Sequence, residues 1–367
     1  MRKANLEQIS NAINNFRVTG EVRGAIPYGN GHINDTFKVI SVDENGKEHK
    51  YILQTVNQNV FKKPEQVMEN IQKVTEYLKA KVETKREVLR LVKTFDDKSY
   101  YKDKNGYFWR MYKFIKDSIC CERPTKEEFY ECAVAFGNFQ RLLSDFPADS
   151  LYETIPNFHH TVKRYENFLK SVEENKSGRL QNVSKEVEFV KARADFYSVL
   201  LDSNKAGVLP LRVSHNDTKS NNVMLDAETH KALCVIDLDT IMHGFSVTDF
   251  GDAVRFGAST AAEDEKDLSK VNFDIEMFSI YAKGFLDGCC GSLPDAEIML
   301  LPEGAKMMTI ECGMRFLADY IDGDTYFKTA YPEHNLDRAR TQFKLVSDME
   351  ENWDTLKAIV KEFCKGE

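Results

Sequence analysis

The stretch that decides the fold is HNDTKSNNVMLD (215–226), followed closely by ALCVIDLDTIM (232–242). Its first part fits the pattern H-x-D-x-x-x-x-N and has a lysine two places after the aspartate. Phosphoryl transfer needs a carboxylate beside the attacking hydroxyl, a neutral oxygen ligand for magnesium and a cation near the moving phosphate. Asp217, Asn222 and Lys219 supply these groups from one loop. The pattern therefore indicates phosphotransfer chemistry, with Asp217 and Lys219 as catalytic residues.

The segment after this loop contains a candidate for a second metal ligand. A polar surface loop can hold His, Asp and Asn by chance, but here the next apolar run ends in an acidic residue, Asp237. Magnesium prefers carboxylates and phosphate oxygens to soft ligands. Asp237 and Asn222 are therefore predicted to bind it, and we expect the imidazole of His215 to hold the loop backbone in place.

A second acidic motif, Asp249-Phe250-Gly251, spells the metal-binding DFG of protein kinases. It does not end an apolar strand, however, and Thr248 is expected to be the N-cap of a following helix. Asp237 fits the metal role better, so Asp249 is expected to cap or anchor that helix.

The two halves of the chain differ in character. The first part is predicted to be β-rich with one helix, in the order strands 22–29, 35–42 and 51–56, helix 64–82, and strands 88–95 and 107–115. The remainder is mainly helical, with helices expected at about 125–144, 159–174, 184–202, 273–286, 305–320 and 333–364. These elements predict an α+β, two-lobed, protein-kinase-like fold. We expect a nucleotide-binding lobe at 1–115 and a helical lobe with the catalytic loop and substrate site at 116–367.

Composition limits the partners and the compartment. The formal net charge of −8 argues against nucleic-acid binding, which depends on Lys and Arg at phosphates. The N-terminus has no apolar h-region, and no run approaches the roughly 20 apolar residues that span a bilayer. The eight cysteines include no CxxC and are interpreted as buried, reduced thiols. His159-His160 is interpreted as a helix start and not a metal site. We therefore expect a cytoplasmic monomer that does not bind a membrane.

The chain resembles the aminoglycoside phosphotransferase and choline kinase superfamily, and within it the N-acetylhexosamine 1-kinases. Four motifs in the family's order carry the resemblance, which covers nearly the whole chain: YGNGHINDTF (28–37), HNDTKSNNVMLD (215–226), VIDLDT (235–240) and TDFGDAVR (248–255). It implies that ATP and Mg²⁺ bind between the lobes. It also implies that Asp217 deprotonates a sugar hydroxyl, that Asn222 and Asp237 bind the metal, and that Gly29-Asn30-Gly31 covers the phosphates.

The same resemblance implies a set of sugar contacts besides Asp217. They are His32, Phe256, Arg315 and Tyr326. From the residues alone, Phe256 could instead belong to the core, and Arg315 could pair with Asp319 one turn further along a helix.

The nucleotide side departs from the usual pattern at one position. The third strand has Gln54 where many kinases have a lysine for the α- and β-phosphates; a glutamine can donate a hydrogen bond to phosphate but has no charge. By position, Lys113, Phe114 and Ile115 at the end of the fifth strand are predicted to contact adenine.

Other functions stay open at this point. An aminoglycoside substrate is compatible with the acidic residues Asp319, Asp322 and Asp324, and choline, homoserine or methylthioribose could also be the acceptor. The uncharged Gln54 would suit a non-catalytic nucleotide-binding pseudokinase, but the presence of Asp217, Asn222 and Asp237 together argues against it.

Overall fold

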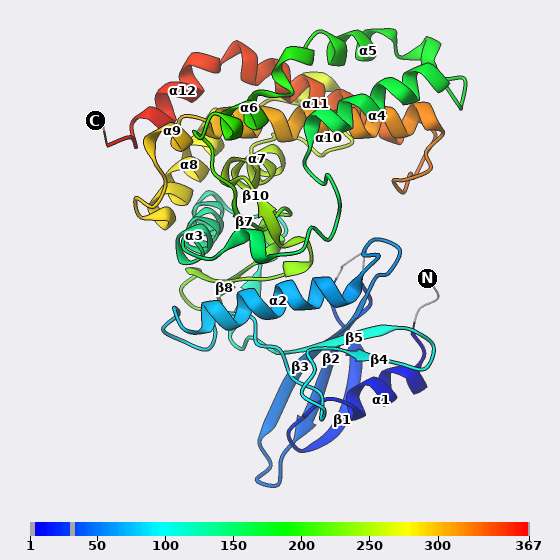
Figure 1. Ribbon diagram of the computed structural model, residues 1–367, viewed down its shortest axis with the longest axis vertical. Helices are drawn as coiled ribbons and strands as arrows, with labels where there is room; N and C mark the ends of the chain where they lie inside the picture. Colours follow the sequence, from blue (N-terminus) through cyan, green and yellow to red (C-terminus); the bar gives the residue numbers. More distant parts are fainter. Residues whose placement is uncertain (1–3, 30–33, 366–367) are drawn as a thin grey trace.

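The computed structural model describes residues 4–29 and 34–365, and it has the kinase-like α+β fold that the sequence predicted (Figure 1). A small antiparallel sheet with two helices forms the N-terminal region, and a larger, mainly helical region follows it. In Figure 1 helix α2 (Pro64–Lys79) runs between the sheet and the helical region.

The N-terminal sheet has the order β1-β2-β3-β5-β4 with antiparallel neighbours throughout. Its strands are β1 (Glu21–Pro27), β2 (Thr36–Val42), β3 (Glu48–Val56), β4 (Tyr101–Lys102) and β5 (Phe108–Lys113). Alternation along the strands directs Val39, Leu53 and Trp109 into a core that they share with helix α1 (Leu6–Asn14). The neighbouring residues Gln54 and Arg110 therefore project from the opposite face, toward the helical region.

The predicted strand 88–95 is wrong. This segment makes only single bridges, Leu91 to Tyr112 and Phe16 to Thr94. The reason lies in β5, whose outer edge is divided: β4 pairs with Phe108 and Trp109, and the 90–92 segment bonds to the other end of the strand. Neither partner has room for a full-length strand. Asn105 and Gly106 lie in the turn between β4 and β5, and α1 was not predicted.

The second half contains most of the helices and two small sheets. The helices are α3 (Lys126–Leu142), α4 (Thr161–Glu174), α5 (Ser184–Lys191), α6 (Val199–Lys205), α7 (Ser246–Gly257), α8 (Ile275–Cys289), α9 (Asp295–Ile298), α10 (Leu301–Asp322), α11 (His334–Glu351) and α12 (Trp353–Lys361). The strands are β6 (Ser118–Cys120), β7 (Arg212–Ser214), β8 (Val223–Asp226), β9 (Ala232–Val235) and β10 (Met242–Gly244).

Two of the predicted helices are each divided in two. The segment 184–202 forms α5 and α6, and the segment 333–364 forms α11 and α12, which meet at Asn352. The Asn352 amide donates to the Asp348 carbonyl, and such a side-chain bond competes with the helical backbone. The predicted N-cap at Thr248 is also wrong, because α7 already begins at Ser246 and the Thr248 hydroxyl donates to the Phe245 carbonyl inside the first turn.

Glycines allow α7 and α10 to lie backbone against backbone. A Cβ on Gly304 would lie 2.0 Å from the Val247 carbonyl oxygen, and one on Gly251 would lie 2.2 Å from the Gly304 oxygen. Only glycine fits such an approach. Helix α7 follows the 215–242 stretch closely in the chain, so α10 packs on the element that comes directly after this stretch.

Two expectations about the chain as a whole can be compared with the structure. All eight cysteines are free thiols, but Cys120 and Cys290 are exposed and not buried. In the described part of the chain, no helix has both the length and the apolar character needed to cross a membrane.

Candidate active site

The β8–β9 hairpin brings the two predicted metal ligands to one place. Val223 pairs with Val235, and beyond this pair the Ile236 amide donates to the Asn222 carbonyl over 2.9 Å. Asn222 enters the hairpin and Asp237 leaves it, so both lie at its open end. Asp237 has a left-handed backbone with φ 57°, which turns the chain sharply after the strand.

His215 holds the catalytic loop in the way the sequence predicted. Its ring is fully buried and packs edge-on against Phe136, with centroids 5.4 Å apart. Its Nε2 lies 2.8 Å from the Ile236 carbonyl oxygen, and its Nδ1 accepts from the Asp217 amide at 3.3 Å. The imidazole therefore links the backbone of Asp217 to the strand that leads into Asp237.

Asp249 anchors the loop from helix α7. Its carboxylate accepts from the amides of His215 and Asn216, each at 2.8 Å, and from the Gln140 side chain at 2.9 Å. It is 2% exposed, and burial raises the pKa of its carboxyl. Both carboxylate oxygens of Asp249 accept hydrogen bonds from the loop backbone. Asp249 therefore anchors the loop, although its sequence motif matches the metal-binding DFG of protein kinases.

Asp217 lies between two donors from its own loop. Lys219 Nζ is 2.7 Å from one carboxylate oxygen, and the Asn222 amide nitrogen is 3.2 Å from the other. The Asn222 nitrogen also donates to the Asp217 carbonyl at 2.8 Å. This arrangement occupies the Asn222 amide nitrogen and leaves the Asn222 amide oxygen as the group that a cation could bind.

Electrostatics at Asp237 indicate a place that suits a cation. Solvent reaches this side chain, yet the surrounding protein removes much of its hydration. Burial, followed by the charges of Asp239 and Asp217, raises the pKa of Asp237 to about 7, against the opposing effect of Arg110. A carboxyl group that is crowded by other carboxylates is stabilised as an anion when a cation binds.

The donor set fits magnesium and not a soft metal. Within residues 4–29 and 34–365, no group of three or more His, Cys, Asp and Glu residues could hold a metal ion. Magnesium needs only one or two carboxylates from the protein, because nucleotide phosphates and water complete its octahedron. Asp237 and the Asn222 oxygen would supply the protein share.

Only some of the residues that were predicted to contact ATP lie within the described part of the chain. Gly29 has a positive φ of 76°, and a Cβ added to it would meet nothing within 4 Å; the turn glycines Gly46 and Gly106 share both features. Asn30, Gly31 and His32 lie outside the described residues. The amides of Lys113 and Phe114 donate to the carbonyls of Arg90 and Lys50, so neither N–H is available to adenine in this arrangement. Contacts from this segment, Ile115 included, would depend on its other backbone groups.

Two of the predicted sugar residues, Arg315 on α10 and Tyr326 in the segment between α10 and α11, lie together. The Arg315 guanidinium lies over the ring of Tyr326, 6.0 Å from its centroid. Asp319 does not pair with Arg315, because its carboxylate accepts from the amides of residues 325–327. Tyr326 is 72% exposed, and Phe256 at the end of α7 is 47% exposed, so Phe256 is not a core residue.

Sequence reasoning missed a second support for the loop. His159 Nε2 lies 3.2 Å from the Asn216 carbonyl oxygen, and its Nδ1 lies 3.1 Å from the Glu311 carboxylate. Burial lowers the pKa of His159, but the hydrogen bond and the charge of Glu311 outweigh it and raise the pKa above 6.5. The His159-His160 pair was correctly placed at a helix start, with His160 as the N-cap of α4. Its contact with residue 311 could not be read from the sequence.

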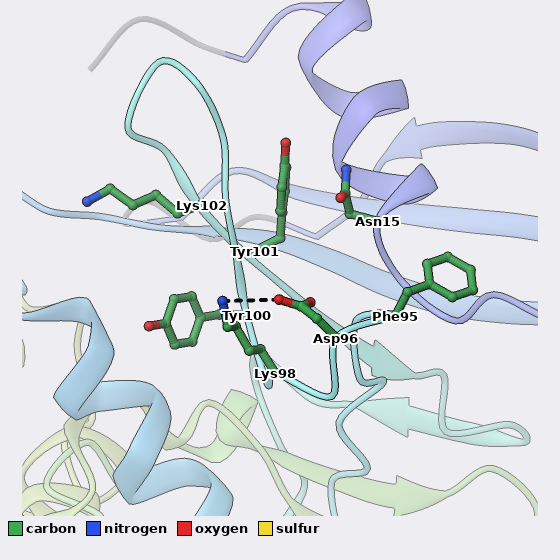
Figure 2. A pocket seen from close by; sticks show the side chains of 7 residues that line it. All are labelled: Asn15, Phe95, Asp96, Lys98, Tyr100, Tyr101 and Lys102. Carbon is green, nitrogen blue, oxygen red and sulfur yellow. Dashed lines mark ion pairs between the residues drawn. The ribbon is translucent and has the colours of Figure 1, made fainter.

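A surface hollow of about 650 Å³ lies apart from this site, between α1 and the turn before β4 (Figure 2). Lys98 and Asp96 form an ion pair of 3.0 Å in its wall. The side chains of Tyr100 and Tyr101 also line the hollow. It contains none of the predicted catalytic, metal or substrate residues.

Comparisons with known proteins identify a family and a fold. A family model described as the phosphotransferase enzyme family matches residues 24–271. Among solved structures, a microcompartment-associated aminopropanol kinase is 14% identical, with a TM-score of 0.62 over 96% of this chain and 99% of the other. An aminoglycoside phosphotransferase from Alicyclobacillus acidocaldarius is 12% identical, with a TM-score of 0.62 over 98% and 97%. An amicoumacin kinase, solved with AMP-PNP and Ca²⁺, is 12% identical, with a TM-score of 0.60 over 93% of each chain.

Proposed function

The chain belongs to the phosphotransferase enzyme family, and on that premise we propose that it is an ATP- and Mg²⁺-dependent kinase that phosphorylates the anomeric hydroxyl of an N-acetylhexosamine, N-acetylglucosamine or N-acetylgalactosamine. The observation that carries the kinase part is the position of Asp217 between Lys219 and Asn222, beside the open end of the hairpin that bears Asp237.

Each of these residues has a defined task in the proposed reaction. Asp217 orients the acceptor hydroxyl and takes its proton, and Lys219, which pairs with Asp217, offsets charge on the transferring group. Asn222 and Asp237 would hold the magnesium ion, which neutralises phosphate charge when bound. The amicoumacin kinase of the same fold was solved with AMP-PNP, an ATP analogue, and Ca²⁺, which supports this assignment.

The sugar part of the proposal depends on the chemistry of Arg315, Tyr326 and Phe256. Arg315 lies against Tyr326, and both can bond hydroxyl or acetamide groups, while the exposed ring of Phe256 can pack on a sugar face. The proposal also agrees with the resemblance to N-acetylhexosamine 1-kinases.

The acidic residues that would suit an aminoglycoside have partners inside the protein. Asp319 accepts from three backbone amides, Asp324 pairs with Arg179, and Asp322 accepts from Ser171. A polycationic substrate needs carboxylates that are free to meet it, so these contacts favour the neutral sugar.

A substrate panel with ATP tests the proposal directly. N-acetylglucosamine and N-acetylgalactosamine are compared with kanamycin, choline, aminopropanol, homoserine and methylthioribose by ADP release, and the phosphorylated position is identified by ³¹P and ¹H NMR. We expect turnover of an N-acetylhexosamine and a product phosphorylated at C1. The sugar assignment is wrong if both hexosamines are inert while another acceptor reacts, and no turnover of any alcohol would support a pseudokinase.

A further inference from the structure

The third strand, β3, has Gln54 where many kinases have a lysine, but the neighbouring strand β5 carries a cation, Arg110. Gln54 on β3 stands opposite Arg110 on β5 in the sheet register. Arg110 Nε donates to the Gln54 side-chain oxygen at 3.0 Å, and the Gln54 nitrogen donates to the Thr36 hydroxyl at 3.0 Å. Arg110 is 1% exposed, so the N-terminal sheet holds a fully buried cation on the face that looks toward the helical region.

The partner of this cation comes from the metal segment. An Arg110 guanidinium nitrogen forms an ion pair with Asp239, whose side chain is 6% exposed. The other carboxylate oxygen of Asp239 accepts from the Asn34 amide at 2.7 Å. Two side chains of the N-terminal region, Arg110 and Asn34, therefore bind Asp239, which lies only two residues after Asp237.

This contact matters because Asp239 belongs to the short helical turn, Leu238–Thr240, that begins directly after Asp237. An unpaired Asp239 would add a further carboxylate to the group formed by Asp217 and Asp237. Cation affinity rises with the number of charged ligands, and a site that binds magnesium too firmly loses the geometry that aligns the phosphates.

We propose that Arg110 is a positioning residue that holds Asp239 on the N-terminal sheet and withholds it from the metal ion, so that Asp237 is the one acidic metal ligand of this segment. The inference rests on the proposed function, since it concerns the same metal site. It also explains the neutral side chain at position 54: a lysine there would face a buried guanidinium 3.0 Å away, whereas Gln54 accepts a hydrogen bond from it.

Four variants test the proposal: Arg110→Met, Arg110→Lys, Asp239→Asn and the double variant Arg110→Met/Asp239→Asn. Binding of Mn²⁺ to each protein is measured in the presence of ADP and without acceptor, by the electron paramagnetic resonance signal of free Mn²⁺. We expect Arg110→Met to bind Mn²⁺ about tenfold more tightly or to take up an additional ion, since Asp239 becomes available as a ligand. The double variant should return to the parent affinity, and Arg110→Lys should stay near it.

Asp239→Asn is the control that does not depend on how well Arg110→Met folds. Its amide can still accept a hydrogen bond from Arg110, and we expect its Mn²⁺ affinity to equal that of the parent. A loss of tenfold or more in this variant would show that Asp239 binds the ion directly and would overturn the inference. Unchanged Mn²⁺ affinity and stoichiometry in Arg110→Met, with only a lower melting temperature, would overturn it too. A parent protein that binds no Mn²⁺ with ADP would instead overturn the proposed function on which the inference rests.

Discussion

Replacing Asp217 with asparagine should nearly abolish turnover while leaving the fold and ATP binding intact. The change removes the proton acceptor, which contributes roughly 10²- to 10⁴-fold to such reactions. That corresponds to about 2.7–5.5 kcal/mol in the barrier, at roughly 1.36 kcal/mol for each factor of ten. The effect on stability should be small, because the ion pair that is lost is part-exposed, with Asp217 and Lys219 side chains 26% and 42% accessible, and such pairs contribute under about 1 kcal/mol.

The assay compares kcat and KM for ATP with a matched variant. Asp202→Asn makes the same chemical change at an exposed aspartate of α6, which also pairs with a lysine, Lys205, at 3.0 Å. We expect Asp217→Asn to lower kcat by at least about a hundredfold with KM for ATP within about threefold of the parent, and Asp202→Asn to behave like the parent. Equal rates in the parent and Asp217→Asn would remove Asp217 from the chemistry and refute the assignment of the loop.

Three further predictions concern the surroundings of the loop. Gly304→Ala should lower the free energy of unfolding, measured with urea, by about 1–3 kcal/mol, because its Cβ would lie 2.0 Å from a backbone oxygen of α7. The control Gly24→Ala should change it little, because a Cβ there meets nothing within 4 Å. Arg315→Met should raise KM for the sugar by about tenfold without changing KM for ATP, and an unchanged sugar KM would exclude Arg315 from the acceptor pocket. His159 has a raised pKa, so the stability that it contributes is full below pH 6.5 and is lost as pH rises through its higher folded value. Thermal melts should show this loss in the parent and not in Glu311→Gln, and identical pH profiles would contradict it.

The part of the site that the sequence predicted is the part whose residues are close in the chain. Asp217, Lys219 and Asn222 belong to one loop, and the β8–β9 hairpin brings Asp237 to the same place through local pairing. A contiguous motif keeps its geometry wherever the rest of the chain places it.

Residues that could not be predicted obtain their roles from distant partners. Arg110 meets Asp239 across 129 positions, and His159 meets Glu311 across 152. No local spacing records such a contact. The false strand at 88–95 has a similar origin, since its residues have strand propensity but must share the edge of β5 with β4. Competition for one edge is decided by the tertiary structure and not by propensity.

These contacts divide the site into a supported part and an open part. The catalytic loop is held by buried groups, with Asp249 on two of its amides and His159 on one of its carbonyls. The proposed sugar contacts, by contrast, include the exposed side chains of Tyr326 and Phe256, which have few neighbours to disturb. A substitution at Tyr326 or Phe256 can therefore change the acceptor that is bound without moving Asp217, whereas a change at Asp249 must shift the loop itself. Acceptor preference should for this reason be far easier to alter than the phosphotransfer chemistry.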